Sequence, residues 1–245
     1  MAKRANYGID APRVVLRFLI MGALGVALGL VLMYPLRNVV LPGLASGLGN
    51  ALVWMGGTFL VVAGVMVAGS KFMKPRIAGK LIDTLALKGD EKVLDVGCGH
   101  GLMLITAARR LTTGQATGVD IWQKEDQAGN SREATLANVR LEGVADRVAL
   151  KDGDARQLPF DDASFDAVTS SWALHNIYDK EGRAQAIREI ARVLKPGGRV
   201  ALVDIQHTEE YAQEFRQSGM ENVKRRGPNF VFVIPSYSLT ATKGA

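Results

Sequence analysis

The sequence of 245 residues predicts a doubly wound α/β fold with a mostly parallel seven-stranded sheet, preceded by two transmembrane α-helices. Two long apolar stretches open the chain, and from about residue 75 short β-type runs alternate with helical patterns. Alternation of this kind places helices on both faces of a parallel sheet. The last two extended runs have no helix between them, which favours a C-terminal antiparallel hairpin. We therefore expect a membrane anchor at residues 1–74 and an α/β domain at residues 75–245.

The two predicted transmembrane helices cover residues 14–34 and 51–72. The first contains Arg17 as its only charge, and residues 51–69 contain none. A helix rises 1.5 Å per residue, so about 20 apolar residues cross a hydrocarbon core of roughly 30 Å. The alternatives are a signal peptide, a single span with an interfacial helix, and a pair of soluble core helices. The first segment is long for a signal peptide, and neither segment has the polar face of a soluble helix.

Small residues recur at a spacing of four in both apolar segments. Gly25 and Gly29 form one such pair, and Gly64 and Ala68 form another. These pairs would let the two helices approach closely. The alternative is that glycine and alanine are simply frequent in membrane helices.

The net charge of +6 is concentrated in the first third of the chain. Residues 1–76 hold eight Lys or Arg and one Asp, and the remainder is nearly balanced, which does not favour nucleic-acid binding. Basic residues flank both apolar segments on their outer sides, whereas the loop between them holds only Arg37. The positive-inside rule then places both termini and the α/β domain in the cytoplasm. The single cysteine, Cys98, excludes an intrachain disulfide, and we predict no metal site.

The α/β part is expected to contain seven strands and five helices. The predicted strands are residues 92–96, 116–120, 147–151, 165–170, 199–204, 222–226 and 230–242. The predicted helices are residues 76–87, 102–111, 131–142, 183–194 and 208–218. Gly227 and Pro228 are expected to separate the last two strands.

A glycine-rich turn follows the first predicted strand, in the run Val93-Leu94-Asp95-Val96-Gly97-Cys98-Gly99-His100-Gly101. Glycines permit a tight turn and a close approach of ligand to backbone. The dinucleotide fingerprint is GxGxxG, whereas Gly101 comes one position early for it. Asp95 would repel a pyrophosphate but suits the ammonium of S-adenosylmethionine, bound directly or through water. This favours the methyl donor, and a nicotinamide-dependent oxidoreductase is the alternative enzyme.

Two more acids follow the next two predicted strands. Asp120 lies 19 residues beyond Gly101 and ends a strand, where an acid can accept hydrogen bonds from both ribose hydroxyls. Asp154 follows the third strand and can accept from the adenine amino group. The alternative for each acid alone is a helix cap or turn residue. Because ligands of open α/β sheets bind at the carboxyl ends of the strands, the three acids together predict a binding site for the donor.

The segments VLDVGCGHG, TGVD, GDARQLPFDDASFDAV and LKPGGRVALVD together resemble the class I S-adenosylmethionine-dependent methyltransferases. The likeness covers residues 75–243 and is closest to the subgroup of ubiquinone/menaquinone-biosynthesis methyltransferases. It implies a Rossmann-like fold and a structural turn at residues 194–198. The N-terminal hairpin is not part of this family's pattern. The donor-binding residues that the resemblance implies are Asp95, Gly97, Cys98, Gly99, Gly101, Asp120, Ile121, Asp154, Ala155 and Ser171.

The segment after the fourth strand faces the methyl group in related enzymes. His175 is the predicted base or acceptor-positioning residue, with a structural histidine as the alternative. Trp172 and Tyr178 are predicted pocket walls, or else packing residues, and His207 is expected near the open edge of the site. Methyl transfer is an in-line displacement that depends on positioning, with a base needed only if the acceptor loses a proton.

The expected acceptor is a small molecule or a lipid. Only 14 residues, 205–218, lead from the fifth strand to the end of the next helix, so no large acceptor-binding insertion is present there. No segment resembles a nucleic-acid-binding module. The predicted anchor motivates a lipid or another membrane-partitioned substrate. The alternative outside enzymes is a membrane-tethered sensor or scaffold that binds the donor without transferring its methyl group.

Overall fold

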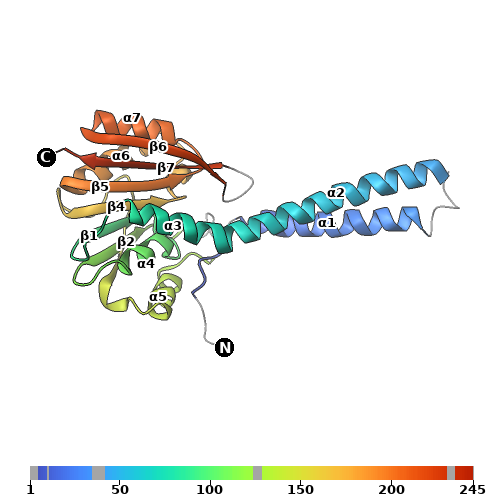
Figure 1. Cartoon of the computed structure of the whole chain (residues 1–245), viewed down its shortest axis with the longest axis horizontal. Helices are drawn as coiled ribbons and strands as arrows, with labels where there is room; N and C mark the ends of the chain where they lie inside the picture. Colours follow the sequence, from blue (N-terminus) through green and yellow to red (C-terminus); the bar gives the residue numbers. More distant parts are fainter. Residues whose placement is uncertain (1–4, 10, 35–41, 124–128, 231–234, 245) are drawn as a thin grey trace.

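The computed structural model describes residues 5–244 except 10, 35–41, 124–128 and 231–234. It has two parts, a long helical hairpin and an α/β unit, and the hairpin projects from one side of the α/β unit (Figure 1). Helices α1 (Pro12–Met33) and α2 (Pro42–Ala68) form the hairpin. Helix α2 continues through a π-helical turn (Gly69–Met73) into α3 (Lys74–Asp83), so one long helix joins the two parts.

The two hairpin helices are long and apolar enough to cross a membrane by length and composition. In their most apolar windows only 22% and 11% of the residues are buried. A core helix of a soluble protein buries its apolar side chains, so this exposure does not fit the core-helix alternative. The large apolar side chains exposed on the hairpin include Leu16, Ile20, Leu24, Leu28, Leu48, Trp54, Met55 and Val61.

Glycines line the contact between α1 and α2. A Cβ atom on Gly25 would lie 3.1 Å from the Cα of Gly56, and one on Gly29 would lie 2.6 Å from the carbonyl oxygen of Gly49. The first predicted small-residue pair therefore does lie where the helices meet. The second pair does not, because a Cβ on Gly64 would have no described atom within 4 Å.

The sheet has the strand order β3-β2-β1-β4-β5-β7-β6. The first five strands run parallel, and β7 is antiparallel to both β5 and β6. This confirms the predicted seven-stranded sheet with its C-terminal antiparallel hairpin. The strands are β1 (Lys92–Val96), β2 (Gln115–Asp120), β3 (Val148–Asp152), β4 (Phe165–Ser171), β5 (Leu194–Asp204), β6 (Met220–Phe230) and β7 (Pro235–Lys243).

Helices cover both faces of the sheet, as a doubly wound fold requires. The remaining helices are α4 (Leu102–Ala108), α5 (Arg132–Leu141), α6 (Lys180–Val193) and α7 (Thr208–Gln217), with 3₁₀ turns at Ala145–Arg147 and Leu174–Asn176. Apolar residues of α3, α4 and α5 share one core with the sheet. Those of α6 and α7 share the other.

Two details of the C-terminal half differ from the prediction. Gly227 and Pro228 do not separate the last strands but lie inside β6, where the register with β7 shifts between Arg226 and Asn229. Proline has no N–H to donate, so such a shift accommodates it within an edge strand. The link between β6 and β7 falls at residues 231–234, outside the described residues. Residues 195–198 bulge from β5 rather than precede it, because Leu194 pairs with Phe165 and Arg199 with Ala167.

The strand order reverses direction between β1 and β4. In open α/β sheets, ligands bind outside the carboxyl ends of the strands at such a switch point. The glycine-rich turn after β1 and the segment after β4 both begin at this point, so the fold itself defines where a ligand site is expected.

Candidate active site

The glycine-rich turn leads from β1 into α4 over residues 97–101. Gly97 has a φ of +70°, and a Cβ atom there would collide with the side chain of Ala173. Only glycine fits this backbone without strain. The N–H of Gly97 donates to the carbonyl oxygen of Val119 at 2.8 Å, which ties the turn to the end of β2.

Asp120 lies at the end of β2 and connects two loops of the site. Its carboxylate accepts hydrogen bonds from the N–H groups of Gly99 and Trp122, both at 2.7 Å. The residue is 8% exposed. This carboxylate therefore faces the glycine-rich turn, and both Asp120 and Ile121 line the pocket described below. Trp122 itself donates its indole N–H to Asp152 at 2.8 Å and is not among the described residues lining the pocket.

Asp154 and Ala155 line the same pocket after β3. The Asp154 carboxylate accepts from the backbone and guanidinium of Arg156, which lowers the pKa of Asp154 and keeps it ionised. An ionised carboxylate here accepts hydrogen bonds only, as an adenine amino group requires.

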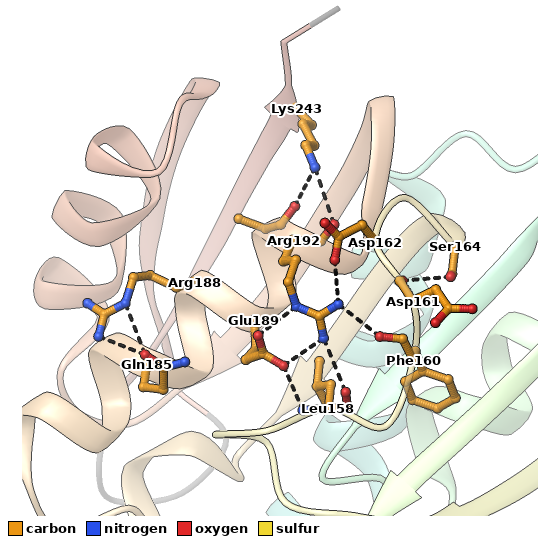
Figure 2. A network of polar contacts seen from close by, with 11 residues as sticks. Leu158, Phe160, Asp161, Asp162, Ser164, Gln185, Arg188, Glu189, Arg192 and Lys243 are labelled. Atoms are coloured by element: carbon orange, nitrogen blue, oxygen red, sulfur yellow. Dashed lines mark hydrogen bonds and ion pairs between the residues drawn. The ribbon is translucent and has the colours of Figure 1, made fainter.

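The loop that follows Asp154 is fastened to α6 by Arg192 (Figure 2). The Arg192 guanidinium donates to the carbonyl oxygens of Leu158 and Phe160 at 3.1 and 2.8 Å and to Asp162 at 2.7 Å. It also pairs with Glu189, whose carboxylate accepts from the Leu158 N–H at 2.7 Å. These hydrogen bonds, each with an ionised donor or acceptor, hold the loop on the body of the fold.

Asp95 is placed differently from the predicted donor contact. Its side chain is 1% exposed and is not among the described residues that line the pocket. The carboxyl group accepts from the Leu104 N–H at 2.9 Å and from the Thr169 hydroxyl at 2.9 Å. Burial raises the pKa of Asp95 to about 7. Asp95 thus braces the glycine-rich turn from behind, against α4 and β4.

A pocket opens at the carboxyl ends of β1, β2, β3 and β4. Of the ten predicted donor-binding residues, Asp95 and Gly101 do not line it, and Gly101 instead is the N-cap residue just before α4, with a φ of +86°. The eight that do are Gly97, Cys98, Gly99, Asp120, Ile121, Asp154, Ala155 and Ser171. Burial raises the pKa of the Cys98 thiol well above its usual value, so this cysteine is a neutral packing residue rather than a nucleophile.

The four predicted acceptor-side residues are not brought together. Trp172 lines the pocket, whereas Tyr178 is 92% exposed and lies outside its described lining. His207 also lies outside it and pairs with Glu210 at 3.0 Å. His175 sits just behind the wall, because its neighbours Leu174 and Asn176 line the pocket and it does not.

His175 is held by a buried acid that the sequence did not reveal. Its Nδ1 lies 2.5 Å from an oxygen of Asp204, and its backbone N–H donates to the other oxygen at 3.1 Å. Asp204 ends β5 and is 2% exposed. A buried carboxylate against Nδ1 fixes the orientation of the imidazole ring. The two residues are 29 positions apart, so no local pattern could have paired them.

Several pocket residues were not predicted, and two of them come from the N-terminal part of the chain. Tyr7 precedes α1, and Lys74 begins α3. His100, Leu102, Gln123 and Asn130 also line the pocket. His100 lies within the glycine-rich run, and this position is the signal that could have identified it as a pocket residue. Tyr7 and Lys74 carry no such signal, because the apolar segments around them indicated only a membrane anchor.

The residues present fit S-adenosylmethionine. Two buried polar atoms of pocket residues, Nδ1 of His100 and Oδ1 of Asn130, have no hydrogen-bond partner among the described residues. Buried polar atoms normally have partners, so their presence beside a pocket is typical of a site for a polar ligand. Asp120 and Asp154 supply acceptors for ribose hydroxyls and an adenine amino group, and the glycine-rich turn leaves room for the methionine moiety.

Comparison with known sequences agrees with this geometry. A family model described as a methyltransferase domain matches residues 94–202. The chain is 40% identical over 129 residues to 27-O-demethylrifamycin SV methyltransferase of Amycolatopsis mediterranei, covering 53% of this chain and 44% of that protein. It is 32% identical over 156 residues to demethylmenaquinone methyltransferase of Lactobacillus johnsonii, covering 63% and 59%. The chain thus spans about half the length of the curated relatives it matches.

Solved structures share the fold. The crystal structure of the [4+2]-cyclase SpnF superposes with a TM-score of 0.58 at 22% identity, covering 70% of this chain and 82% of that chain. Likeness at this identity concerns the fold alone. The matched sequence, the glycine-rich turn and the acids at the strand ends agree with one another. Residues 94–202 therefore match a methyltransferase domain, and the pocket beside them fits S-adenosylmethionine as the methyl donor.

Proposed function

We propose that this protein is a membrane-anchored methyltransferase that transfers the methyl group of S-adenosylmethionine to a small-molecule or lipid acceptor. The observation that carries the proposal is the pocket at the sheet's switch point. It gathers the glycine-rich turn, Asp120 and Asp154 from three successive strand ends. Separate structural roles would not require these residues to face one cavity.

The strand order gives the donor an orientation. Asp120 and Ile121 follow β2, and Asp154 and Ala155 follow β3, so the adenosine belongs over these two strands. The glycine-rich turn follows β1, and the Ser171 segment ends β4, so the methionine moiety belongs on that side. The acceptor then approaches past Trp172, where the methyl group is presented.

Bound S-adenosylmethionine supplies an activated methyl group on a positively charged sulfur. The chain's contribution is to align the acceptor with that methyl group and to exclude water. For an acceptor that loses a proton, we propose His175 as the base, with Asp204 orienting its Nδ1 side and leaving Nε2 to act. Because Leu174 and Asn176 form the wall in front of it, His175 would act through a shift of this 3₁₀ turn or through a water molecule.

The anchor is the second part of the proposal. Exposed apolar side chains along α1 and α2 support a hairpin that crosses the bilayer, and the basic flanks support cytoplasmic termini. A site tethered at the membrane surface suits an acceptor that partitions into the bilayer. One similar protein is named for demethylmenaquinone, a membrane-partitioned quinone, so prenylated naphthoquinols are the first class to test.

The test is a transfer assay with the full chain in liposomes, tritium-labelled S-adenosylmethionine and a reduced prenylated naphthoquinone. We expect label in the prenylated quinol and much less in the same naphthoquinol without a prenyl chain. Asp120→Ala should weaken donor binding about tenfold to a hundredfold, because it removes hydrogen bonds to a charged group. Asp152→Ala, at the exposed end of β3 and outside the described pocket lining, is the matched control. His175→Gln should lower kcat by about 10²–10⁴ if it is the base.

The outcomes separate the alternatives. Donor binding without methylation of these quinols or of extracted membrane lipids would favour a sensor or scaffold. Binding of a nicotinamide cofactor in place of S-adenosylmethionine would favour an oxidoreductase. Methylation of the quinol that does not depend on Asp120 would mean that the donor lies elsewhere.

A further inference from the structure

Lys74 enters the donor pocket from the helix that continues the membrane hairpin. It is the only lysine or arginine among the described residues that line the pocket. The residue is 8% exposed, which is uncommon for a lysine. Lys74 therefore places a largely buried positive charge beside the pocket.

The position of Lys74 is fixed at the β4 side of the pocket. Its Nζ lies 4.5 Å from the centre of the Trp172 ring, a cation–π distance. Trp172 is itself held in place, since its indole N–H donates to the Ser236 hydroxyl at 3.1 Å and its backbone N–H to Val203 at 2.8 Å. Trp172 also has a φ of +48°, a conformation that non-glycine residues rarely adopt. The ammonium therefore rests on a fixed aromatic platform beside the glycine-rich turn.

Charge complementarity then points to one group of the donor. The acids that line the pocket, Asp120 and Asp154, lie on the β2 and β3 side, where the adenosine belongs. In the proposed orientation the methionine moiety would lie on the β1 and β4 side, and it carries a carboxylate. A carboxylate that leaves water for a partly enclosed pocket needs a charged partner, and a lysine ammonium is a compact one.

We propose that Lys74 is a donor-binding residue whose ammonium holds the α-carboxylate of S-adenosylmethionine. This rests on the proposed function, because it assumes that the pocket takes this donor. The proposal adds to the donor site a residue from the start of α3, directly after the predicted membrane anchor. The donor site is then completed by the helix that leaves the membrane hairpin.

The other end of the hairpin is attached to the same site. The Asn138 side chain exchanges two hydrogen bonds of 2.9 Å with the backbone of Asn6, just before α1. The same amide donates to the carbonyl oxygen of His100 in the glycine-rich turn at 3.0 Å. Tyr7, next in sequence, lines the pocket. The segments that flank the hairpin on both sides therefore contribute residues to the donor pocket.

The experiment compares two ligands that differ only in the carboxylate, S-adenosylmethionine and decarboxylated S-adenosylmethionine. Isothermal titration uses the full chain in detergent, as wild type, Lys74→Met, Lys74→Arg and the control Lys80→Met. Lys80 is an exposed lysine on the same helix, α3. We expect Lys74→Met to weaken S-adenosylmethionine about tenfold to a hundredfold, the range for a charged hydrogen bond, and to leave the decarboxylated ligand within about twofold. Lys74→Arg should recover part of the loss, and Lys80→Met should match wild type.

Two results would overturn the inference. An equal loss for both ligands in Lys74→Met would make Lys74 a wall residue with no carboxylate contact, and no loss for either would remove it from the site. Retained binding of the decarboxylated ligand shows that the variant is folded. Failure of the wild type to bind either ligand would refute the proposed function instead, so the two failures are distinguishable.

Discussion

Asp95 shows how a residue can support a pocket without lining it. Its carboxyl group is buried behind the glycine-rich turn and accepts hydrogen bonds from Leu104 and Thr169. Burial disfavours the charged form, and the nearby charge of Asp120 adds to this effect, so the pKa rises to about 7. The folded protein therefore prefers a neutral carboxyl group at a position where the unfolded chain ionises near pH 4.

Because of this preference, the free energy of unfolding falls as pH rises toward 7. Between about pH 4 and pH 7 the folded state binds the Asp95 proton and the unfolded state does not. The contribution to stability is therefore full at low pH and is lost as pH rises through about 7, by at most about 1.4 kcal/mol per pH unit. Asp95→Asn should abolish this loss, since its amide is always neutral.

We expect the melting temperature of Asp95→Asn, relative to wild type, to rise between pH 5 and pH 8. The measurement is thermal unfolding of both proteins in detergent, without ligand, across that range. A difference that stays constant with pH would show that Asp95 is ionised throughout and that its hydrogen bonds outweigh its burial.

The site residues that directly follow a strand could be predicted from the sequence. Asp120 and Asp154 each follow a strand, and parallel strands bring their carboxyl ends to one edge of the sheet. Asp204 was not predictable as the partner of His175, because tertiary packing alone joins them. Lys74 was hidden for another reason, since basic residues beside an apolar segment normally indicate only the orientation of an anchor.

At the scale of the elements, the contact between α1 and α2 depends on the absence of side chains. A Cβ atom on Gly56 would lie 2.7 Å from the carbonyl oxygen of Gly22, which is backbone that cannot rotate away. Small residues let membrane helices approach closely, and the van der Waals packing that results contributes to their association. Gly64 lies on the same helix, with no described atom near its Cβ position.

We expect Gly56→Ala to destabilise the hairpin by about 1–3 kcal/mol, the usual cost of overpacking. Gly64→Ala should be neutral or slightly stabilising, since alanine is the better helix former. Thermal unfolding of the two variants in the same detergent measures the difference. Equal melting temperatures would mean that α1 and α2 do not pack through Gly56.

The order of elements in the α/β unit followed from the sequence because each strand and helix carries its own apolar period. The ends of the individual helices and strands were predicted less accurately. Helix α6 begins at Lys180 rather than near residue 183, because Asp179 caps it by accepting from the Gly182 N–H at 2.5 Å. The break expected at Gly227 and Pro228 was wrong, because β6 is an edge strand and tolerates a proline.

At the scale of the whole molecule, the apolar hairpin and the α/β unit form two distinct ends, an arrangement that suits attachment to a membrane. The hairpin extends away from the α/β unit (Figure 1). Tyr7 before α1 and Lys74 after α2 both line the pocket. Lys71, Arg76 and Lys80 lie where the long helix reaches the α/β unit. Anionic headgroups on the cytoplasmic side attract such residues. This arrangement would hold the pocket close to the bilayer surface, where a membrane-partitioned acceptor is concentrated.

This arrangement predicts the sidedness of two engineered cysteines. Helix α2 has 27 residues and measures about 40 Å, longer than a hydrocarbon core of roughly 30 Å, so Leu44 in its first turn should lie outside the membrane. Glu133, exposed on α5, should lie in the cytoplasm. A membrane-impermeant maleimide should label Leu44→Cys in intact bacterial spheroplasts and Glu133→Cys only after permeabilisation. The wild type, with its buried Cys98, measures background. The reverse pattern would invert the topology, and release of the protein by alkaline carbonate would show that the hairpin does not span the bilayer.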